Sequence, residues 1–357
     1  MKACDIIIIG GGIIGLSLAI ELSKRSLHVL VVERGEPGRE ASHAAAGMLA
    51  DCGMEIPAAL QTLATASARL YPEFVHALQD ESGVNVDLRD QGTILFLTSE
   101  DVVARTKFPG ERLPPERLAV LEPMLADPNR PAIYLRERSV DPRALTLAAF
   151  RAAKHREVNI ASGTEVAEIL ISEGRAGGVR TDRTAYKAAV VVNCAGAWAG
   201  QLGPHRFPTR LPVRPVKGQM LSVVGAPVVE HVIRSSEVYL VPRSDGRILI
   251  GATVEEAGYD KRKDGETIRR MHQAAVRLIP ALAQARRHEA WAGLRPGTPD
   301  DLPIMGTTET PGYFVATGHF RDGILLAPAT ARVMAQLVTG EEPDYELAAF
   351  SPQRFRC

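Results

Sequence analysis

Short apolar runs alternate along the chain with longer stretches whose apolar residues recur at helical spacing. The first run, Ile6–Ile9, is rich in β-branched residues and ends at a glycine, which is typical of a buried parallel strand. Residues 16–25 then show a helical pattern, and a second apolar run over 27–32 ends at Glu33. This order predicts a strand, a helix and a second strand at the start of the chain.

The same patterns predict further elements over the rest of the chain. Helices are expected at four places: Ala58–Ser82, Pro142–His155, Gly265–Ile279 and Gly323–Val338, the last despite Pro328. Further strands are expected at Thr93–Leu97, Ala188–Asn193 and Tyr313–Ala316. An antiparallel sheet is predicted from three more stretches: Gln219–Val224, Val238–Pro242 and Arg247–Ala252. Residues 106–143 carry many prolines and charges, which favours surface loops with short elements.

Length and charge narrow the class of protein. With 357 residues the chain suggests about two domains and a core that needs no disulfide or metal. The 42 Lys and Arg balance the 42 Asp and Glu, which argues against nucleic-acid binding and against a polybasic membrane arm. The uncharged stretch Ile6–Ile20 is too short to span a bilayer, so we expect no membrane insertion.

Cysteine and histidine spacing disfavours several chemistries. The cysteines are at least 48 residues apart, at Cys4, Cys52, Cys194 and Cys357, and form no CxxC motif. The histidines show no HExxH spacing, so we expect no metal site, and the hydrolase pattern GxSxG is absent. Because no secretory leader pattern is present either, we expect a cytoplasmic protein with reduced thiols.

The glycine-rich turn after the first strand carries the first candidate chemistry. Gly10, Gly12 and Gly15 satisfy the GxGxxG pattern, and Glu33 follows at the end of the second strand. The first glycine permits a tight turn, the second lets a pyrophosphate approach the backbone, and the third lets the helix pack on the strand. The helix N-terminus offers N–H groups to phosphate, and the acid accepts hydrogen bonds from a ribose. The motif predicts FAD or NAD rather than NADP.

Residues 39–50 follow this motif and are mostly small. Small side chains let the backbone approach a flat ring and a pyrophosphate closely. The same composition also fits the start of a tightly packed helix. These residues alone therefore do not separate FAD from NAD.

Four segments give the chain a resemblance to a known family. Residues 44–49, AAAGML, closely resemble the segment after the dinucleotide motif in the glycine oxidases of the thiamine pathway, which belong to the D-amino-acid oxidase family of flavoproteins. Three further segments are similar to that family: VNCAGAW over 192–198, WAGLRPGT over 291–298 and GHFRDGILLAP over 318–328. Together they cover the chain from end to end in the family's order.

The resemblance implies an α/β fold, α+β overall. A Rossmann-like FAD-binding domain would be interleaved with a substrate domain built on an antiparallel sheet. The FAD-binding domain is expected to be discontinuous, over residues 1–83, 143–212 and 293–357. The substrate-binding domain would take residues 84–142 and 213–292. The resemblance also implies a homo-oligomer, a tetramer or a dimer.

The resemblance further assigns roles in substrate binding and catalysis. Arg295 falls where the family's carboxylate-binding arginine lies, and arginine offers a carboxylate a permanently charged bidentate donor. Arg321 falls at a substrate-contacting position, and Tyr239 matches a tyrosine that hydrogen-bonds the substrate carboxylate. Ala50 and Val254 fall where the family shapes its small pocket.

Two departures from the family pattern concern the amine that is bound. Glu237 stands where the best-known glycine-oxidase pattern has histidine. Asp51 adds an acid near the expected entrance. The resemblance therefore leaves the preferred amine open.

FAD is expected to bind non-covalently, although Cys52 and His43 are near enough in sequence to keep covalent attachment open. The N-terminus of the helix after residue 318 would face the flavin N1–C2=O edge, where its N–H groups stabilise negative charge. The expected cofactor contacts are Gly10, Gly12, Ile13, Ile14, Gly15, Glu33, Arg34, Ala41, Ser42, Ala46, Gly47, Met48, Val166, Ala195, Gly196, His319, Phe320, Arg321, Asp322, Gly323, Ile324 and Leu325.

The function that the resemblance implies is oxidative deamination of glycine and other small amines. A hydride would pass from the substrate α-carbon to flavin N5, and O2 would reoxidise the flavin to give H2O2. The products would be an imine, or glyoxylate and ammonia, and the imine can also serve thiamine biosynthesis. Alternatives are a sarcosine or D-amino-acid oxidase, or a quinone-linked dehydrogenase of the same fold. A non-catalytic FAD-bound scaffold and an NAD-linked dehydrogenase also stay open.

Overall fold

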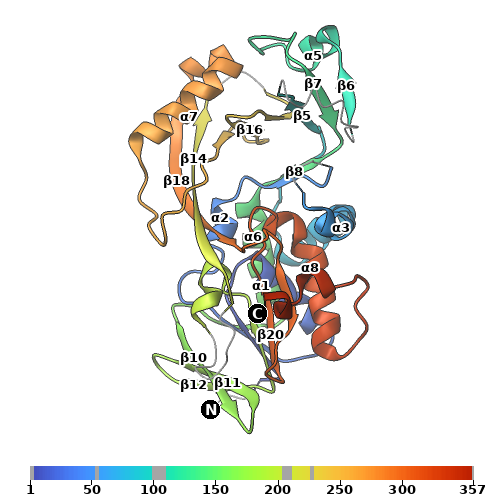
Figure 1. Ribbon diagram of the computed structural model, residues 1–357, viewed down its shortest axis with the longest axis vertical. Coiled ribbons are helices and arrows are strands. Elements are labelled where there is room, and N and C mark those ends of the chain that lie inside the picture. The colour runs from blue at the N-terminus through green and yellow to red at the C-terminus, as the bar shows by residue number, and fades with distance from the viewer. Residues whose placement is uncertain (1–3, 53–55, 99–109, 203–210, 226–228, 356–357) are drawn as a thin grey trace.

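Two large sheets organise the part of the chain that the structure, a computed structural model, describes: residues 4–52, 56–98, 110–202, 211–225 and 229–355. The first sheet lies in the lower half of Figure 1 and has six strands in the order β19-β20-β13-β1-β2-β9. Five of them run parallel, and β19 pairs antiparallel with β20. Their bounds are β1 Ile6–Ile9, β2 Val29–Val32, β9 Asn159–Ala161, β13 Val190–Asn193, β19 Ile304–Thr307 and β20 Tyr313–Thr317.

Both faces of this sheet are buried, which explains the uninterrupted apolar run of β1. Ile6 and Ile8 pack against helices, whereas Ile7 and Ile9 face a small three-stranded sheet. The helices are α1 Ile13–Ser23, α3 Ala58–Ser82, α6 Pro142–His155 and α8 Gly323–Thr339. The small sheet comprises β10 Val166–Ser172, β11 Arg175–Thr181 and β12 Ala185–Lys187.

Helix α8 continues through Pro328 because α3 supplies the missing hydrogen bond. A proline has no N–H, so the carbonyl of Ile324 loses its donor four residues later. The hydroxyl of Tyr71 donates to that carbonyl instead. One turn earlier on α3, the hydroxyl of Ser67 donates to the carbonyl of Leu325 and accepts from the N–H of Ala329, so it bridges the next pair of backbone groups of α8.

The second large sheet lies in the upper half of Figure 1 and has eight strands in the order β18-β14-β17-β16-β15-β5-β7-β6. All neighbours in it are antiparallel except β15 and β5. Its strands are β5 Thr93–Phe96, β6 Glu111–Leu113, β7 Ala132–Leu135, β14 Arg214–Val224, β15 Val232–Arg234, β16 Tyr239–Pro242, β17 Ile248–Gly251 and β18 Arg286–Gly297. Helices α5 Pro115–Leu121 and α7 Gly265–Leu278 pack on one face through apolar residues.

Two long strands connect the upper and lower parts of the molecule. β14 and β18 pair from Arg214 opposite Gly297 to Val224 opposite Arg286, and Figure 1 shows them running down from the upper sheet toward the lower one. The remaining elements are short: α2 Ala41–Ala44, β3 Met48–Leu49, β4 Leu88–Arg89, β8 Arg138–Val140, and 3-10 turns at Gly196–Gln201, Pro280–Gln284, Ala348–Phe350 and Pro352–Phe355.

Most predicted elements agree with the structure. α3 and α6 have the predicted bounds, and α7 and α8 each differ by one residue at the C-terminus. The first helix begins at Ile13 rather than at residue 16, because the chain turns into the helix directly after Gly12. The predicted antiparallel sheet is confirmed in β14, β16 and β17.

Residues 110–143 contain the predicted short elements between loops, but the interpretation as surface structure is wrong for β7, and 106–109 lie outside the described residues. β7 lies inside the eight-stranded sheet between β5 and β6, and Ile133 and Leu135 are buried. Pro114 and Pro131 fall between elements, whereas Pro115 and Pro142 begin helices α5 and α6. β7 is a strand because it pairs with β5, which is distant in sequence.

The domain boundaries stay a prediction, and the proposed one between 292 and 293 falls inside β18. Across the described ranges, no helix combines the length and apolar character that crossing a membrane requires. In those same ranges, no cluster of three or more His, Cys, Asp or Glu side chains could hold a metal ion.

Candidate cofactor and substrate site

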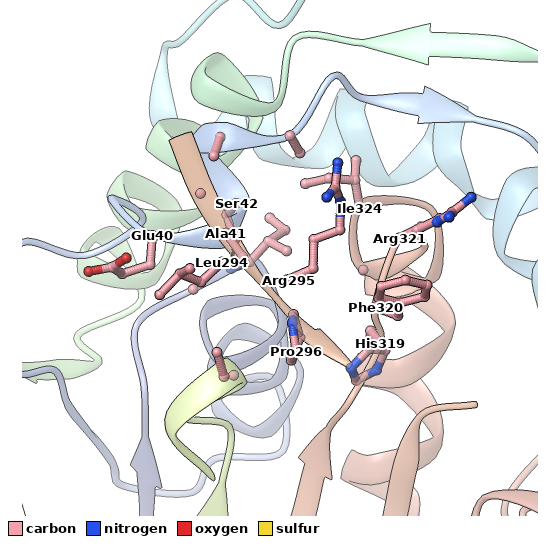
Figure 2. Close-up of a pocket in the computed structure, with 18 of the residues that line it drawn as sticks. Glu40, Ala41, Ser42, Leu294, Arg295, Pro296, His319, Phe320, Arg321 and Ile324 are labelled. Atoms are coloured by element: carbon pink, nitrogen blue, oxygen red, sulfur yellow. Dashed lines mark hydrogen bonds between the residues drawn. The ribbon is translucent and has the colours of Figure 1, made fainter. Parts of the chain in front are cut away.

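A single cavity of about 720 Å³ between the two large sheets brings the predicted site residues together. Figure 2 shows residues Glu40–Ser42 on one side and His319–Arg321 on the other, with β18 residues Leu294–Pro296 between them. Every predicted site residue lines this cavity except Gly15 and Leu325. Its size lies within the range of sites that hold large organic ligands.

The glycine turn at one end of the cavity has the geometry that the motif requires. Gly10 has a φ of +108°, and a β-carbon there would collide with the carbonyl of Cys194. A β-carbon at Gly15 would collide with the carbonyl of Gly10, so Gly15 permits close packing of α1 on β1 and does not need to line the cavity. Ser42 reaches this turn from α2, where its hydroxyl accepts a hydrogen bond of 3.0 Å from the N–H of Ile13.

Glu33 lies at the end of β2 and lines the same end of the cavity. Its two carboxylate oxygens accept hydrogen bonds of 2.8 Å from the N–H groups of Gly11 and Gly35. A carboxylate has about four acceptor positions, so both oxygens keep capacity for ribose hydroxyls. The next residue is Arg34, whose Cζ lies 3.5 Å from the ring centroid of Trp198. Its Nη2 pairs with Oε1 of Glu40 over 3.0 Å.

The small residues after α2 line the middle of the cavity. Ala44, Ala45, Ala46, Gly47 and Met48 all belong to its wall. Gly47 has a φ of +75°, and a β-carbon there would collide with the carbonyl of a residue in β8. Gly47 therefore allows this segment to pack closely against β8, while the same small residues also line the cavity.

Arg295 and Tyr239, the residues that the resemblance assigns to substrate binding, lie together in the cavity wall. A β-carbon on Gly218 would collide with the guanidinium of Arg295, and one on Gly251 would collide with the ring of Tyr239, so each side chain lies flat over a glycine. Arg295 Nη1 also donates to the carbonyl of Thr253 over 3.1 Å. Two strand glycines thus give room for an arginine and a tyrosine side by side.

The electrostatics of this end favour an anion. Burial lowers the pKa of Arg295, and the nearby Tyr239 opposes that shift. Surrounding protein atoms raise the pKa of Tyr239, while the charges of Arg295 and Arg321 oppose the rise. The arginine stays charged and the phenol stays protonated at pH 7, so both can donate hydrogen bonds to a carboxylate.

The remaining predicted substrate residues lie around the same end. Ala50 and Val254 line the cavity, and Val254 is 54% exposed, which puts it at the opening. Arg321 lines the cavity as well, but its side chain is exposed and lies 5.1 Å from the ring of Phe320. Glu237 lines the opening and pairs with Arg277.

The start of α8 borders the cavity and carries unpaired amides. Within the described residues, no hydrogen bond engages the N–H groups of Gly323, Ile324 or Leu325, as is usual for a first helical turn. His319, just before the helix, is buried, and burial lowers its pKa to about 3. This end of the helix can therefore stabilise negative charge with neutral donors.

Two residues that kept covalent attachment open lie outside the cavity wall. Neither His43 nor Cys52 lines it. Burial and the charge of Asp51 raise the pKa of the Cys52 thiol to about 12, so it is not a thiolate at pH 7. Both observations fit a cofactor held without a covalent bond.

The cavity wall also contains residues that the sequence analysis missed. Gly218 and Gly251 are the clearest, together with Met220 and Trp198. A glycine in a strand often marks a close approach of another group, and Gly218 lies inside β14 while Gly251 ends β17. No comparable signal identifies Met220, because its place in the wall depends on how distant strands pair, whereas Trp198 ends the segment VNCAGAW that carries the family resemblance.

Comparison with known proteins places the chain among flavoproteins. The family model "DAO: FAD dependent oxidoreductase" matches residues 5–337. The bifunctional protein ThiO/ThiG of Trichormus variabilis is 36% identical over 99% of this chain, which spans 55% of that longer protein. The hydrogen cyanide synthase subunit HcnC of Pseudomonas aeruginosa is 33% identical over 99% of this chain and 97% of its own length.

Among solved structures, the glycine oxidase of Geobacillus kaustophilus superposes with a TM-score of 0.93. The two chains are 32% identical, and the match covers 100% of each. The expected fold class, a Rossmann-like part interleaved with an antiparallel sheet, is confirmed by this match.

Proposed function

Because the chain belongs to the DAO family of FAD-dependent oxidoreductases, we propose that it oxidises glycine and closely related small amines. The family confirms FAD rather than NAD as the cofactor and agrees with the resemblance inferred from the sequence. The observation that carries the proposed substrate is the pair Arg295 and Tyr239, each lying over a strand glycine in the wall of the cofactor cavity. The glycine oxidases among the relatives support the same choice.

The cavity provides the parts that FAD needs. The turn at Gly10 and Gly12 with the start of α1 would hold the pyrophosphate, and Glu33 would hold the ribose. Residues 44–48 and the start of α8 would hold the ring. When bound, FAD supplies the two-electron acceptor for amine oxidation.

The protein's own contribution to the reaction is positioning. Arg295 binds the substrate carboxylate through two N–H groups, and the hydroxyl of Tyr239 donates to the same carboxylate. This fixes the α-carbon in one orientation relative to the cofactor, which lowers the entropy cost of the reaction. Arg321, at the opening, adds positive charge that attracts the carboxylate. No side chain needs to act as a covalent nucleophile.

The proposal predicts consumption of O2 and release of H2O2 when glycine is supplied. Imine hydrolysis would give glyoxylate and ammonia, and we propose that the imine can serve thiamine biosynthesis. An oxygen electrode with glycine, sarcosine and D-alanine would rank these amines. Turnover of sarcosine or D-alanine but not glycine would replace the proposed substrate, and no oxygen uptake with any amine would contradict the oxidase.

A second candidate concerns the electron acceptor. One full-length relative is named a subunit of hydrogen cyanide synthase, so at least that protein works as part of a larger enzyme. We propose as the alternative an amino-acid dehydrogenase that passes electrons to a quinone. Glycine-dependent reduction of a quinone analogue without H2O2 release would favour this alternative over the oxidase.

A further inference from the structure

Side chains from distant elements hold the backbone carbonyls of the segment His43–Gly47. Arg143 on α6 donates through Nε to the carbonyl of His43 over 3.3 Å. Trp291 on β18 donates through Nε1 to the carbonyl of Ala44 over 3.0 Å. These carbonyls end the short helix α2, where they have no donor within the helix.

Arg243 holds a third carbonyl of the segment and is the most buried of the three donors. It follows β16, is 4% exposed, and donates through Nη2 to the carbonyl of Ala46. Its Nε and Nη1 have no hydrogen-bond partner within the described residues. Burial lowers its pKa to about 10 while the charge of Asp141 opposes the shift, so the guanidinium remains charged at pH 7. A buried cation with so few partners stabilises the fold weakly, which favours a positional role.

The backbone N–H groups of Ala45, Ala46 and Gly47 in the same segment, unlike its three bound carbonyls, have no hydrogen-bond partner within the described residues. All three residues line the cavity. Amides in the interior of a protein are almost always paired, so this row of donors is available to acceptor atoms of a molecule bound in the cavity.

We propose that Arg143, Trp291 and Arg243 are positioning residues for the flavin ring. By binding the carbonyls of residues 43, 44 and 46, they hold the segment in the one orientation that leaves the amides of residues 45–47 free for acceptor atoms of the ring. These N–H groups would bind the ring and would stabilise the negative charge that it gains on reduction. The inference concerns the cofactor and does not depend on which amine is oxidised.

Trp291→Phe tests this with little change of shape. It removes the Nε1–H donor but keeps an aromatic ring beside Arg143, whose Cζ lies 4.7 Å from the Trp291 ring centroid. We expect FAD to leave the diluted holoenzyme about tenfold faster, since one hydrogen bond to a partly buried carbonyl is lost. We also expect a more negative midpoint potential for the bound flavin. Flavin fluorescence on dilution and a spectroelectrochemical titration measure the two quantities.

Arg89→Met is the matched control. Arg89 also donates to a backbone carbonyl, that of Glu230 over 3.2 Å, but it does not line the cavity or touch the segment. Its loss should lower the melting temperature and leave FAD release and the potential unchanged. The proposal is overturned if Trp291→Phe releases FAD at the wild-type rate, or if Arg89→Met accelerates release equally.

Arg243 provides an independent check on the same idea. Arg243→Met should accelerate FAD release, whereas Arg243→Lys, which keeps a charged donor, should restore slow release in part. Equal release rates for the two variants would show that Arg243 acts only through packing and would contradict its positioning role.

Discussion

At the scale of single residues, the substrate end of the cavity depends on two positions that have no side chain. Gly218 and Gly251 lie under Arg295 and Tyr239, and a methyl group at either position would occupy space that the larger side chain now fills. The guanidinium of Arg295 and the ring of Tyr239 are thus placed as much by the strand beneath them as by their own rotamers. A large side chain that lies flat across a β-sheet in this way needs a glycine beneath it, and a glycine weakens the strand.

Gly218→Ala tests that dependence. The added methyl should displace the guanidinium of Arg295 and lower kcat/KM for glycine by about 100-fold, because misplacement by about 1 Å has effects of that size. The matched control is Gly177→Ala in β11, where the nearest non-neighbouring atom would be 4.0 Å from the new β-carbon. Steady-state kinetics of both variants decide the matter, and equal kcat/KM values would contradict the account.

At the scale of elements, helix α3 supplies a hydrogen bond that helix α8 lacks at Pro328. Tyr71 on α3 donates to the carbonyl of Ile324, which Pro328 cannot reach because it has no N–H. Ile324 also lines the cavity. The packing of α3 on α8 therefore fixes the helix start that borders the cavity, and Pro328 lies where the two helices are in contact.

A double-mutant cycle measures this compensation. Tyr71→Phe should lower the free energy of unfolding by about 1–3 kcal/mol, because the buried carbonyl of Ile324 loses its donor. In a Pro328→Ala background the new amide can donate to Ile324, so the same change should cost about 1 kcal/mol less. Denaturant unfolding of the four proteins gives the coupling. Strictly additive effects would mean that Tyr71 acts through packing alone.

Sequence predicted local elements better than the pairing between them. The bounds of α6 could be predicted because Asp141 caps the helix and Pro142 begins it, both local signals. β18 was missed because its Gly293, Pro296 and Gly297 disfavour a strand locally, and only its pairing with β14 makes it one. The glycine motif predicted residues that line one end of the cavity, while the neighbours of Arg295 required the sheet register.

At the scale of the whole molecule, one cavity is walled by residues from both large sheets. Arg295 and Tyr239 come from the eight-stranded sheet, and Gly10 and Glu33 follow strands of the six-stranded sheet. A ligand that fills the cavity contacts both parts and must stabilise the folded chain as a whole. The net charge of zero gives no sign of this site, because the positive charges that favour an anion are local to the cavity.

Removal of FAD should therefore destabilise the protein. At free FAD 100 times its Kd, binding adds about 2.7 kcal/mol to the free energy of unfolding. The melting temperature should rise with the logarithm of added FAD and fall when the cofactor is stripped. Differential scanning fluorimetry across a series of FAD concentrations measures this. A melting temperature that is independent of FAD would mean that the cavity does not bind it.

The most direct test of the central claim is an anaerobic titration of the purified protein with glycine, followed by its visible spectrum. We expect a yellow protein whose flavin absorbance bleaches as glycine is added and returns on admission of air. Arg295→Met should still be yellow but should require far more glycine to bleach. A protein that shows a flavin spectrum and keeps it unchanged at saturating glycine, in the wild type as in the variant, would contradict the proposed function.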